Sequence, residues 1–372
     1  MRCLQSPDPG AAASGSEANS GRLPSLDGLR AVSIALVLLG HLDGTANFGR
    51  FRVWSGDVAH LGVTMFFVIS GFLITRLLID DETRQGRVCL RRFYSRRALR
   101  IVPAFLVYVA VMAGLHVAGI VHLHTGDLAH AITYTVNFEA DSSWQIGHLW
   151  SLSVEEQFYL LWPFAFMCAT ATGRIWIAVA TVAVGPLARA AAAFFLRGSP
   201  YGDLEMFPMV ADSLATGCLL ACTQGWLEQR PAYLALFRAP SSLGLVVVLF
   251  FTNRYMDHTL VDVVRSCPTN IALAILIHRS VARAHDKVGR ILNSPALTWA
   301  GVLSYSLYLW QQPFLDRHSA AWINAFPQNL LLAVAAAVLS YWMLEKPLLR
   351  IRKKLRGTAP VRPVMEAQSA PV

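Results

Sequence analysis

Residues 148–159 read HLWSLSVEEQFY, where a histidine, two adjacent glutamates and a glutamine interrupt an apolar and aromatic stretch. These polar side chains could lie on a soluble loop, or they could be buried in lipid. Burial in lipid is costly, and ionisable residues inside a membrane usually line an internal site or a wet cavity. The surroundings of this stretch therefore decide the fold.

The composition is that of a membrane protein. The chain has 372 residues, of which 55% are hydrophobic and only 15% are charged, whereas soluble domains carry about 25% charged residues. A spanning helix needs about 20 mostly apolar residues. We predict an all-α polytopic membrane protein with about ten transmembrane helices. The expected segments are 26–44, 58–79, 98–121, 149–170, 175–195, 204–223, 233–252, 263–279, 296–315 and 326–345.

The basic residues predict the orientation of these segments. A dense block of arginines lies between the second and third segments, and no Lys or Arg occurs between Arg100 and Arg174. If both termini are cytoplasmic, few basic residues fall outside, as the positive-inside rule requires. The outer ones would be Arg50, Arg52, Arg189, Arg197, Arg254, Arg265 and Arg317. Topology thus explains the net charge of +9, and nucleic-acid binding is not expected.

The ends of the chain predict two tails around one membrane domain. Residues 1–22 are small, polar and rich in Pro and Gly, and they lack the order of a secretory signal. We expect a disordered cytoplasmic tail at 1–22, a transmembrane domain at 23–349 and a basic cytoplasmic tail at 350–372. A group of histidines suggests a metal at first sight, but we interpret them as solvent-exposed loop histidines and expect no metal site. These histidines are His116, His122, His124 and His130.

Arg30 and His41 lie eleven residues apart in the first segment, which corresponds to roughly 16 Å of helical rise. Arg30 should then lie at the cytoplasmic face and His41 in the outer half of the membrane. The alternative is that His41 ends a helix at the lipid surface.

The fourth segment is expected to enter from outside, with His148 at the outer interface. Glu155 and Glu156 would then lie about 10–12 Å deeper, near the depth of His41. Consecutive residues point about 100° apart on a helix. One glutamate should face a cavity while the other pairs with an arginine or a backbone donor, and the spacing does not choose between them.

Arg97 and Arg100 begin the third segment and share a helix face. They could clamp a phosphate, because guanidinium groups bind phosphate in a bidentate manner, or they could simply anchor the helix. Asp212 lies inside the sixth segment and needs a partner.

Two functions fit this layout. A histidine assisted by a carboxylate could act as a general base that activates a hydroxyl, with an anionic donor held by the arginines. Alternatively, His41, Glu155 and Asp212 could relay protons in an ion-coupled transporter.

Several stretches together resemble acyltransferase family 3, the bacterial integral-membrane acyltransferases of polysaccharides, nodulation factors and macrolides. They follow the order of the family across nearly the whole chain after residue 22. The stretches are LDGLRAVSIALVLLGHL (26–42), GVTMFFVISGFLIT (62–75), FYSRRALRIVPAF (93–105), HLWSLSVEEQFYLLWP (148–163), ADSLATGCLLA (211–221), LSYSLYLWQQP (303–313) and EKPLLR (345–350).

The resemblance implies roles for individual residues. It implies that His41 is the essential histidine and that the arginines bind the acyl donor, normally acetyl-CoA or a related thioester, which is a substrate and not a bound cofactor. Glu155 is the carboxylate that matches the family pattern in preference to Glu156. The implied donor-binding arginines are Arg30, Arg97 and Arg100, and the implied supporting residues are His148, Trp150, Glu156 and Asp212.

The expected function is therefore transfer of an acyl group from cytoplasmic acyl-CoA to a hydroxyl of a surface or lipid-linked glycan, such as lipopolysaccharide or exopolysaccharide. His41, oriented by Glu155, would deprotonate the acceptor or take the acyl group itself. A secondary metabolite such as a macrolide is the alternative acceptor. The expected location is the bacterial inner membrane, in contact with its lipids. Many family members carry a further soluble domain. Here we expect either that a partner protein supplies any second transfer step or that this enzyme acts alone on its acceptor.

Overall fold

The protein is seen here as a computed structural model that describes residues 23, 25–49, 57–196, 199, 205–255 and 259–349. These residues form helices and their connections, and no strand occurs among them. The all-α prediction is confirmed. The two predicted tails, 1–22 and 350–372, lie outside the described residues.

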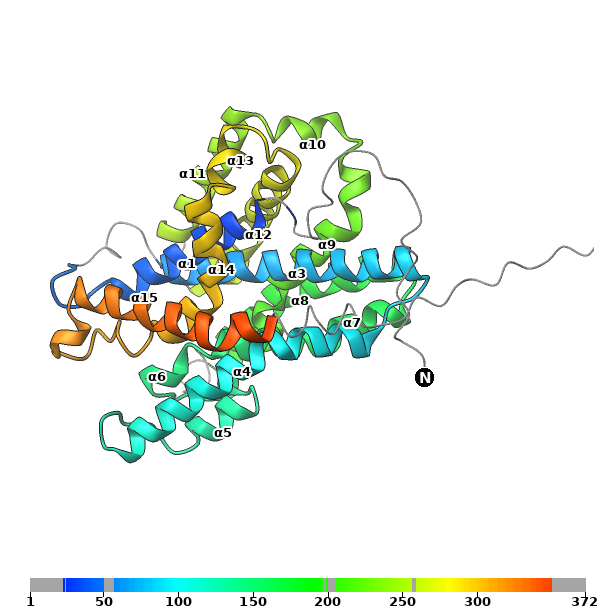
Figure 1. Cartoon of the computed structure of the whole chain (residues 1–372). Helices are drawn as coiled ribbons and strands as arrows, with labels where there is room; N and C mark the ends of the chain where they lie inside the picture. Colours follow the sequence, from blue (N-terminus) through cyan, green and yellow to red (C-terminus); the bar gives the residue numbers. More distant parts are fainter. Residues whose placement is uncertain are drawn as a thin grey trace, which may run out of the picture.

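Helices occupy all of the predicted segments (Figure 1). The long ones are α1 (Leu26–Leu42), α3 (Val58–Gln85), α4 (Leu90–Val117), α7 (Trp150–Cys168), α8 (Ala171–Phe195), α9 (Phe207–Leu227), α11 (Ala239–Tyr255), α12 (Thr259–Ala282), α14 (Pro295–Trp310) and α15 (Gln328–Ser340), which continues as the π-helical turn η3 (Tyr341–Glu345). Short helices connect them: α5 (Asp127–Ile132), η1 (Val136–Phe138), α6 (Trp144–Gly147), α10 (Pro231–Ala235), α13 (Lys287–Leu292) and η2 (Trp322–Asn324).

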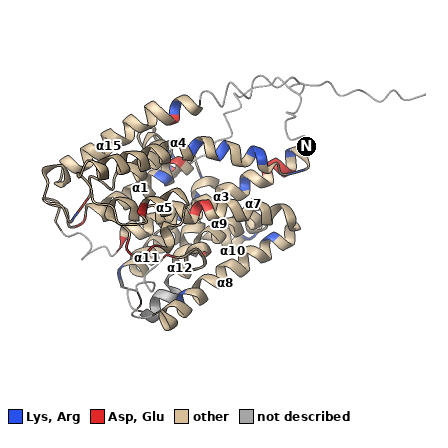
Figure 2. Cartoon of the chain, turned by 90° about the horizontal axis from the view of Figure 1, so that it is seen from below, with Lys and Arg blue, Asp and Glu red and all other residues tan. Residues whose placement is uncertain are grey.

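Four helices are long and apolar enough to cross a membrane by length and composition: α3, α4, α8 and the continuous helix Gln328–Leu349. Charged residues are sparse over most of the bundle, and a run of basic residues lies along the N-terminal part of α4 (Figure 2). The expectation of ten crossings with both termini in the cytoplasm stays a prediction.

Helix α3 packs between α1 and α9 through glycines that allow the backbones to touch. A Cβ atom on Gly62 would lie 2.6 Å from the Ser33 carbonyl oxygen of α1. A Cβ atom on Gly71 would lie 1.9 Å from the Leu214 carbonyl oxygen of α9, and one on Gly217 would lie 2.1 Å from the Val68 carbonyl oxygen of α3. A larger side chain at any of these positions would push the helices apart.

Helices α1 and α14 run side by side in the same direction. Near their N-terminal ends, a Cβ atom on Gly301 would lie 1.8 Å from the Asp27 carbonyl oxygen. Near their C-terminal ends, the side chains of Gln311 and His41 are hydrogen-bonded. Both ends of this contact are thus fixed, which sets the register of the two helices.

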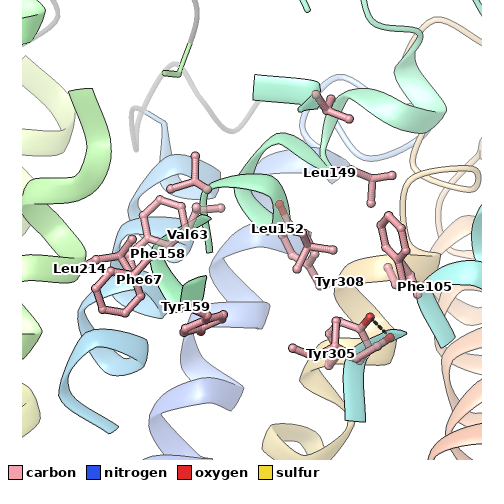
Figure 3. Packing of buried hydrophobic residues seen from close by; sticks show 14 of the residues in the cluster. Val63, Phe67, Phe105, Leu149, Leu152, Phe158, Tyr159, Leu214, Tyr305 and Tyr308 are labelled. Carbon is pink, nitrogen blue, oxygen red and sulfur yellow. Dashed lines mark hydrogen bonds between the residues drawn. The ribbon is translucent and has the colours of Figure 1, made fainter. Parts of the chain in front are cut away.

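The core beside α14 is aromatic. Figure 3 shows Leu152 and Tyr159 of α7 near Tyr305 and Tyr308 of α14, with Phe105 of α4 among the same buried side chains. The Tyr305 hydroxyl donates to the Ile101 carbonyl at 2.8 Å and ties α14 to α4. This packing surrounds the cavity described next.

Candidate functional site

A cavity of about 100 Å³ lies between α1, α3, α4, α7 and α14, and we call it the arginine cavity. Its charged lining is the three arginines and one of the glutamates that the sequence singled out, drawn from helices far apart in the chain. These residues are Arg30, Arg97, Arg100 and Glu155. The rest of the wall is apolar or carries hydroxyl groups, including Ser70, Ser151, Tyr159, Ser304, Tyr305 and Tyr308.

Arg30 and Arg100 have no paired carboxylate in the part of the chain that the structure describes, and neither makes a hydrogen bond there. The two like charges lie within electrostatic range of each other. Glu345 lies within the same range of both, but its carboxylate accepts a hydrogen bond from Ser306. Asp27 and Glu155 also lie within electrostatic range of Arg30, but neither forms an ion pair with it. Guanidinium groups without a directly bonded carboxylate are costly between helices, so this end of the cavity is prepared for an anion.

Arg97 is held by an aromatic ring and by two carboxylates at a distance. Its guanidinium carbon lies 2.9 Å from the centre of the Tyr159 ring. Its nitrogens lie 3.8 Å from a Glu155 oxygen and 3.7 Å from a Glu156 oxygen. These separations exceed those of a charge-assisted hydrogen bond, which are about 2.7–2.9 Å. Arg97 is therefore positioned but retains donors for a ligand.

The two glutamates have different surroundings. Glu155 lines the arginine cavity and accepts a hydrogen bond from Ser70 of α3 at 2.7 Å. Glu156 contacts Arg97 from the other side and does not line the cavity. The geometry thus places on the cavity wall the carboxylate that the family pattern favours, while its role in the reaction stays a prediction.

Tyr308 and Ser151 close one end of the cavity. The Tyr308 hydroxyl lies 2.5 Å from the Ser151 hydroxyl and donates to the His148 carbonyl at 2.8 Å. The buried His148 imidazole lies behind this layer, with its ring centre 5.6 Å from those of Tyr108 and Tyr308. His148 is thus a buried residue between helices α6 and α7, on the far side of the closing layer.

His41 lies beyond this layer, at the last turn of α1, and does not line the arginine cavity. Its Nδ1 atom lies 2.8 Å from Oε1 of Gln311, and its ring centre lies 5.9 Å from that of Trp144. His41 and His148 lie within electrostatic range of each other. Arg317 donates to the Gly40 carbonyl at 3.3 Å and covers the Trp144 ring.

The expected support of His41 by Glu155 is not formed. Glu155 is committed to Ser70 and Arg97 and lies within electrostatic range of Arg30, eleven residues before His41. The expectation that Glu155 reaches the depth of His41 is therefore wrong. His41 lies instead within electrostatic range of His148, so the depth expected for His41, rather than the count of helical rise from His148 to Glu155, was at fault.

Like His148 and Glu156, the other two supporting residues expected from the sequence lie outside the cavity. Trp150 packs edge-on against Phe67 with ring centres 5.9 Å apart, which makes it part of the core. Asp212 pairs with Arg189 at 2.9 Å and accepts a hydrogen bond from Ser266 at 2.7 Å. Arg189, which the expected topology assigns to the outer side, lies on α8 as the partner of this buried carboxylate.

Sequence reasoning missed several residues that shape the site. Ser70 and Tyr159 position the charged groups of the cavity, while Trp144 and Gln311 contact His41. Uncharged side chains of this kind give no signal in a sequence pattern.

Comparison with known proteins identifies the family. A family model described as an acyltransferase domain matches residues 23–345. The chain belongs to acyltransferase family 3. This membership confirms the resemblance that the motifs carry and the expectation of an acyltransferase.

Curated relatives support the acyltransferase assignment. The chain is 28% identical over 363 residues to the O-acetyltransferase OatA of Staphylococcus aureus strain NCTC 8325 / PS 47, a match that covers 89% of this chain and 57% of the relative. The O-acetyltransferase OatA of Staphylococcus aureus strain COL matches with the same identity and coverage. The chain thus spans rather more than half the length of these relatives. No solved structure matches the chain.

Proposed function

We propose that this protein is a membrane O-acetyltransferase that takes an acetyl group from acetyl-CoA at the arginine cavity and transfers it to a hydroxyl of a surface or lipid-linked glycan at His41. The family and the O-acetyltransferase relatives support the reaction type. The donor, the glycan acceptor and a location in the bacterial inner membrane are our inferences from the site.

One observation carries the proposal: Arg30 and Arg100 line a cavity without a carboxylate partner, beside an Arg97 that is only loosely paired. Three guanidinium groups in one cavity form a strong site for phosphate groups, which guanidinium binds with two parallel hydrogen bonds. Coenzyme A carries several phosphates at one end and its thioester at the other. Binding of the phosphates at the arginines leaves the thioester arm to extend along the apolar wall toward Tyr308.

The chemistry of the transfer is assigned to His41. A ring nitrogen of His41 takes the proton of the acceptor hydroxyl, and the hydroxyl oxygen forms a bond to the thioester carbonyl carbon. The carbon–sulfur bond then breaks, and the coenzyme A sulfur leaves and receives the proton from His41. The products are the acetyl ester and free coenzyme A, so atoms and charge balance.

Tyr308 and Ser151 separate the two parts of the site. Their hydrogen bonds close the cavity on the side of His148, and His41 does not line it. The thioester reaches His41 only if this layer opens, which keeps water away from the donor until the acceptor is in place. The transfer therefore requires a movement of the Tyr308 and Ser151 side chains.

The test is acetyl transfer by the purified protein in lipid nanodiscs, with radiolabelled acetyl-CoA and a bacterial glycan extract. Wild-type protein is expected to label the glycan, and the His41→Ala variant to lose the transfer by about 10²- to 10⁴-fold. Label on the wild-type protein alone would indicate that His41 first takes the acetyl group. Retained transfer in His41→Ala, or no consumption of acetyl-CoA by the wild type, would overturn the proposal.

A further inference from the structure

Gln311 contacts the one imidazole to which we assign the transfer, and its contacts determine which ring nitrogen carries the proton. It is fully buried at the C-terminus of α14, where its backbone N–H donates to the Leu307 carbonyl. Its side-chain Oε1 lies 2.8 Å from His41 Nδ1. A buried amide with one oxygen and one NH₂ group can be satisfied only when each faces the matching partner.

The other half of the Gln311 amide fixes its orientation. Nε2 of Gln311 donates to Oε1 of Gln312 at 2.9 Å, so the Gln311 oxygen faces His41. An oxygen accepts and does not donate, and the atom opposite it must therefore carry a hydrogen. His41 is consequently protonated on Nδ1, and in the neutral ring the lone pair is on Nε2.

The surroundings hold this arrangement in place. Trp144 stands edge-on to the His41 ring, and its indole N–H donates to the Gln312 carbonyl at 2.9 Å. The register of α1 and α14 is fixed at the far end by the contact of Gly301 with Asp27. Neither helix can therefore slide to bring another residue opposite His41 in place of Gln311.

We infer that Gln311 is a positioning residue that keeps His41 in the Nδ1–H form, so that Nε2 is the atom that accepts the proton of the acceptor hydroxyl. The inference rests on the proposed function for its catalytic meaning. The Nδ1–H form itself follows from the amide orientation in which Gln311 donates to Gln312. Gln311 thus takes the part that a carboxylate plays in a Ser–His–Asp triad, and it does so without burying a charge.

The direct test is ¹⁵N NMR of the full chain in nanodiscs with labelled histidine, in which the His41 signals are those missing from His41→Ala. In the neutral ring the wild type is expected to show a protonated Nδ1 and an unprotonated Nε2. Gln311→Leu should lose this pattern and gain the Nε2–H form. A protonated Nε2 in the wild type, or an unchanged pattern in Gln311→Leu, would overturn the inference whether or not an acceptor is known.

Kinetics give the second readout. Gln311→Leu is expected to lower kcat by about 10²-fold with little change in KM for acetyl-CoA, because the arginine cavity lies elsewhere. Gln311→Glu keeps an oxygen opposite Nδ1 and should restore most of the lost rate. Asn270→Leu is the matched control, since Asn270 is a buried amide on α12 that accepts from Ser213. A loss of kcat in Asn270→Leu equal to that in Gln311→Leu would contradict a positioning role.

Discussion

The Asp212–Arg189 pair and the Glu155–Arg97 pair differ in how completely their charged groups are satisfied. Asp212 and Arg189 are 2.9 Å apart, and Ser266 adds a hydrogen bond to the same carboxylate. Glu155 and Arg97 are 3.8 Å apart and line a cavity that also holds two unpaired arginines. The Asp212–Arg189 pair, which we call the close pair, is satisfied without a ligand. The Glu155–Arg97 pair, which we call the open pair, has N–H groups left to bind one. The distance between the charged groups and the presence of a cavity beside them, rather than the residue types, distinguish a pair that supports the fold from a pair that binds a ligand.

The largest effect is expected when the close pair is broken. Asp212→Asn leaves Arg189 without its counter-charge, and removal of one partner of a buried pair costs about 3–5 kcal/mol. The free energy of unfolding should fall by this amount, as measured by thermal or denaturant unfolding in detergent. The dissociation constant for acetyl-CoA should stay near that of the wild type in the folded fraction. Weaker donor binding without lower stability would show that Asp212 belongs to the donor site.

The open pair should respond in the opposite way. Arg97→Gln removes a charged donor from the cavity, and a hydrogen bond to a charged group contributes about 1.5–3 kcal/mol. The dissociation constant for acetyl-CoA, measured by calorimetry, should rise by about 10- to 150-fold. Arg91→Gln is the matched control, because Arg91 is an exposed arginine of the same helix. Equal weakening by both variants would contradict a specific cavity.

A smaller effect is expected when the serine that donates a hydrogen bond to each carboxylate is replaced. Ser70 donates to Glu155 and Ser266 donates to Asp212, each at 2.7 Å. Ser70→Ala should free Glu155 to move onto Arg97, where it competes with a donor phosphate. The dissociation constant for acetyl-CoA should then rise by about tenfold, or about 1.5 kcal/mol.

Ser266→Ala provides the comparison for Ser70→Ala. It should lower the stability of the fold by about 1–3 kcal/mol and leave donor binding unchanged. Both quantities can be measured on the same preparations by unfolding and by calorimetry. The contrast between the two pairs would be contradicted if both alanine variants changed only the free energy of unfolding, or both changed only the dissociation constant for acetyl-CoA.

The smallest effect is expected at an exposed pair, where solvent screens the charges. The Asp141 carbonyl accepts a hydrogen bond from the His124 imidazole and, with nearby carboxylates, raises the pKa of His124 above its ordinary value. A raised pKa favours the folded state below the ordinary pKa, and the contribution is lost as pH rises through the folded value. An NMR titration should show a His124 pKa above that of free histidine. A value at or below it would contradict the contact.

Helix positions followed from the sequence because apolar runs of membrane length are a strong signal. The gathering of Arg30, Arg97 and Arg100 also followed, since the expected topology brings the start of the first segment and the start of the third to one side. The partners of the charged groups did not follow. Glu155 was assigned to His41, but it contacts Ser70 and Arg97, because His41 lies near His148 and not at the level of Glu155.

The uncharged partners could not be predicted at all. Gln311 reaches His41 only through the register of α1 and α14, which depends on the close contact at Gly301. No pattern in either helix alone contains that register. Asp212 and Glu155 looked alike as carboxylates in apolar helices, and only the positions of Arg189 and Arg97 separate them.

The central claim is that donor binding and acetyl transfer use different parts of the molecule, the arginine cavity and His41. The most direct measurement is the dissociation constant of acetyl-CoA, by calorimetry in nanodiscs, for His41→Ala and Arg97→Gln. The account predicts that His41→Ala binds acetyl-CoA as the wild type does while Arg97→Gln binds it much more weakly. Equal loss of binding in both variants would place His41 in the donor site and contradict the account.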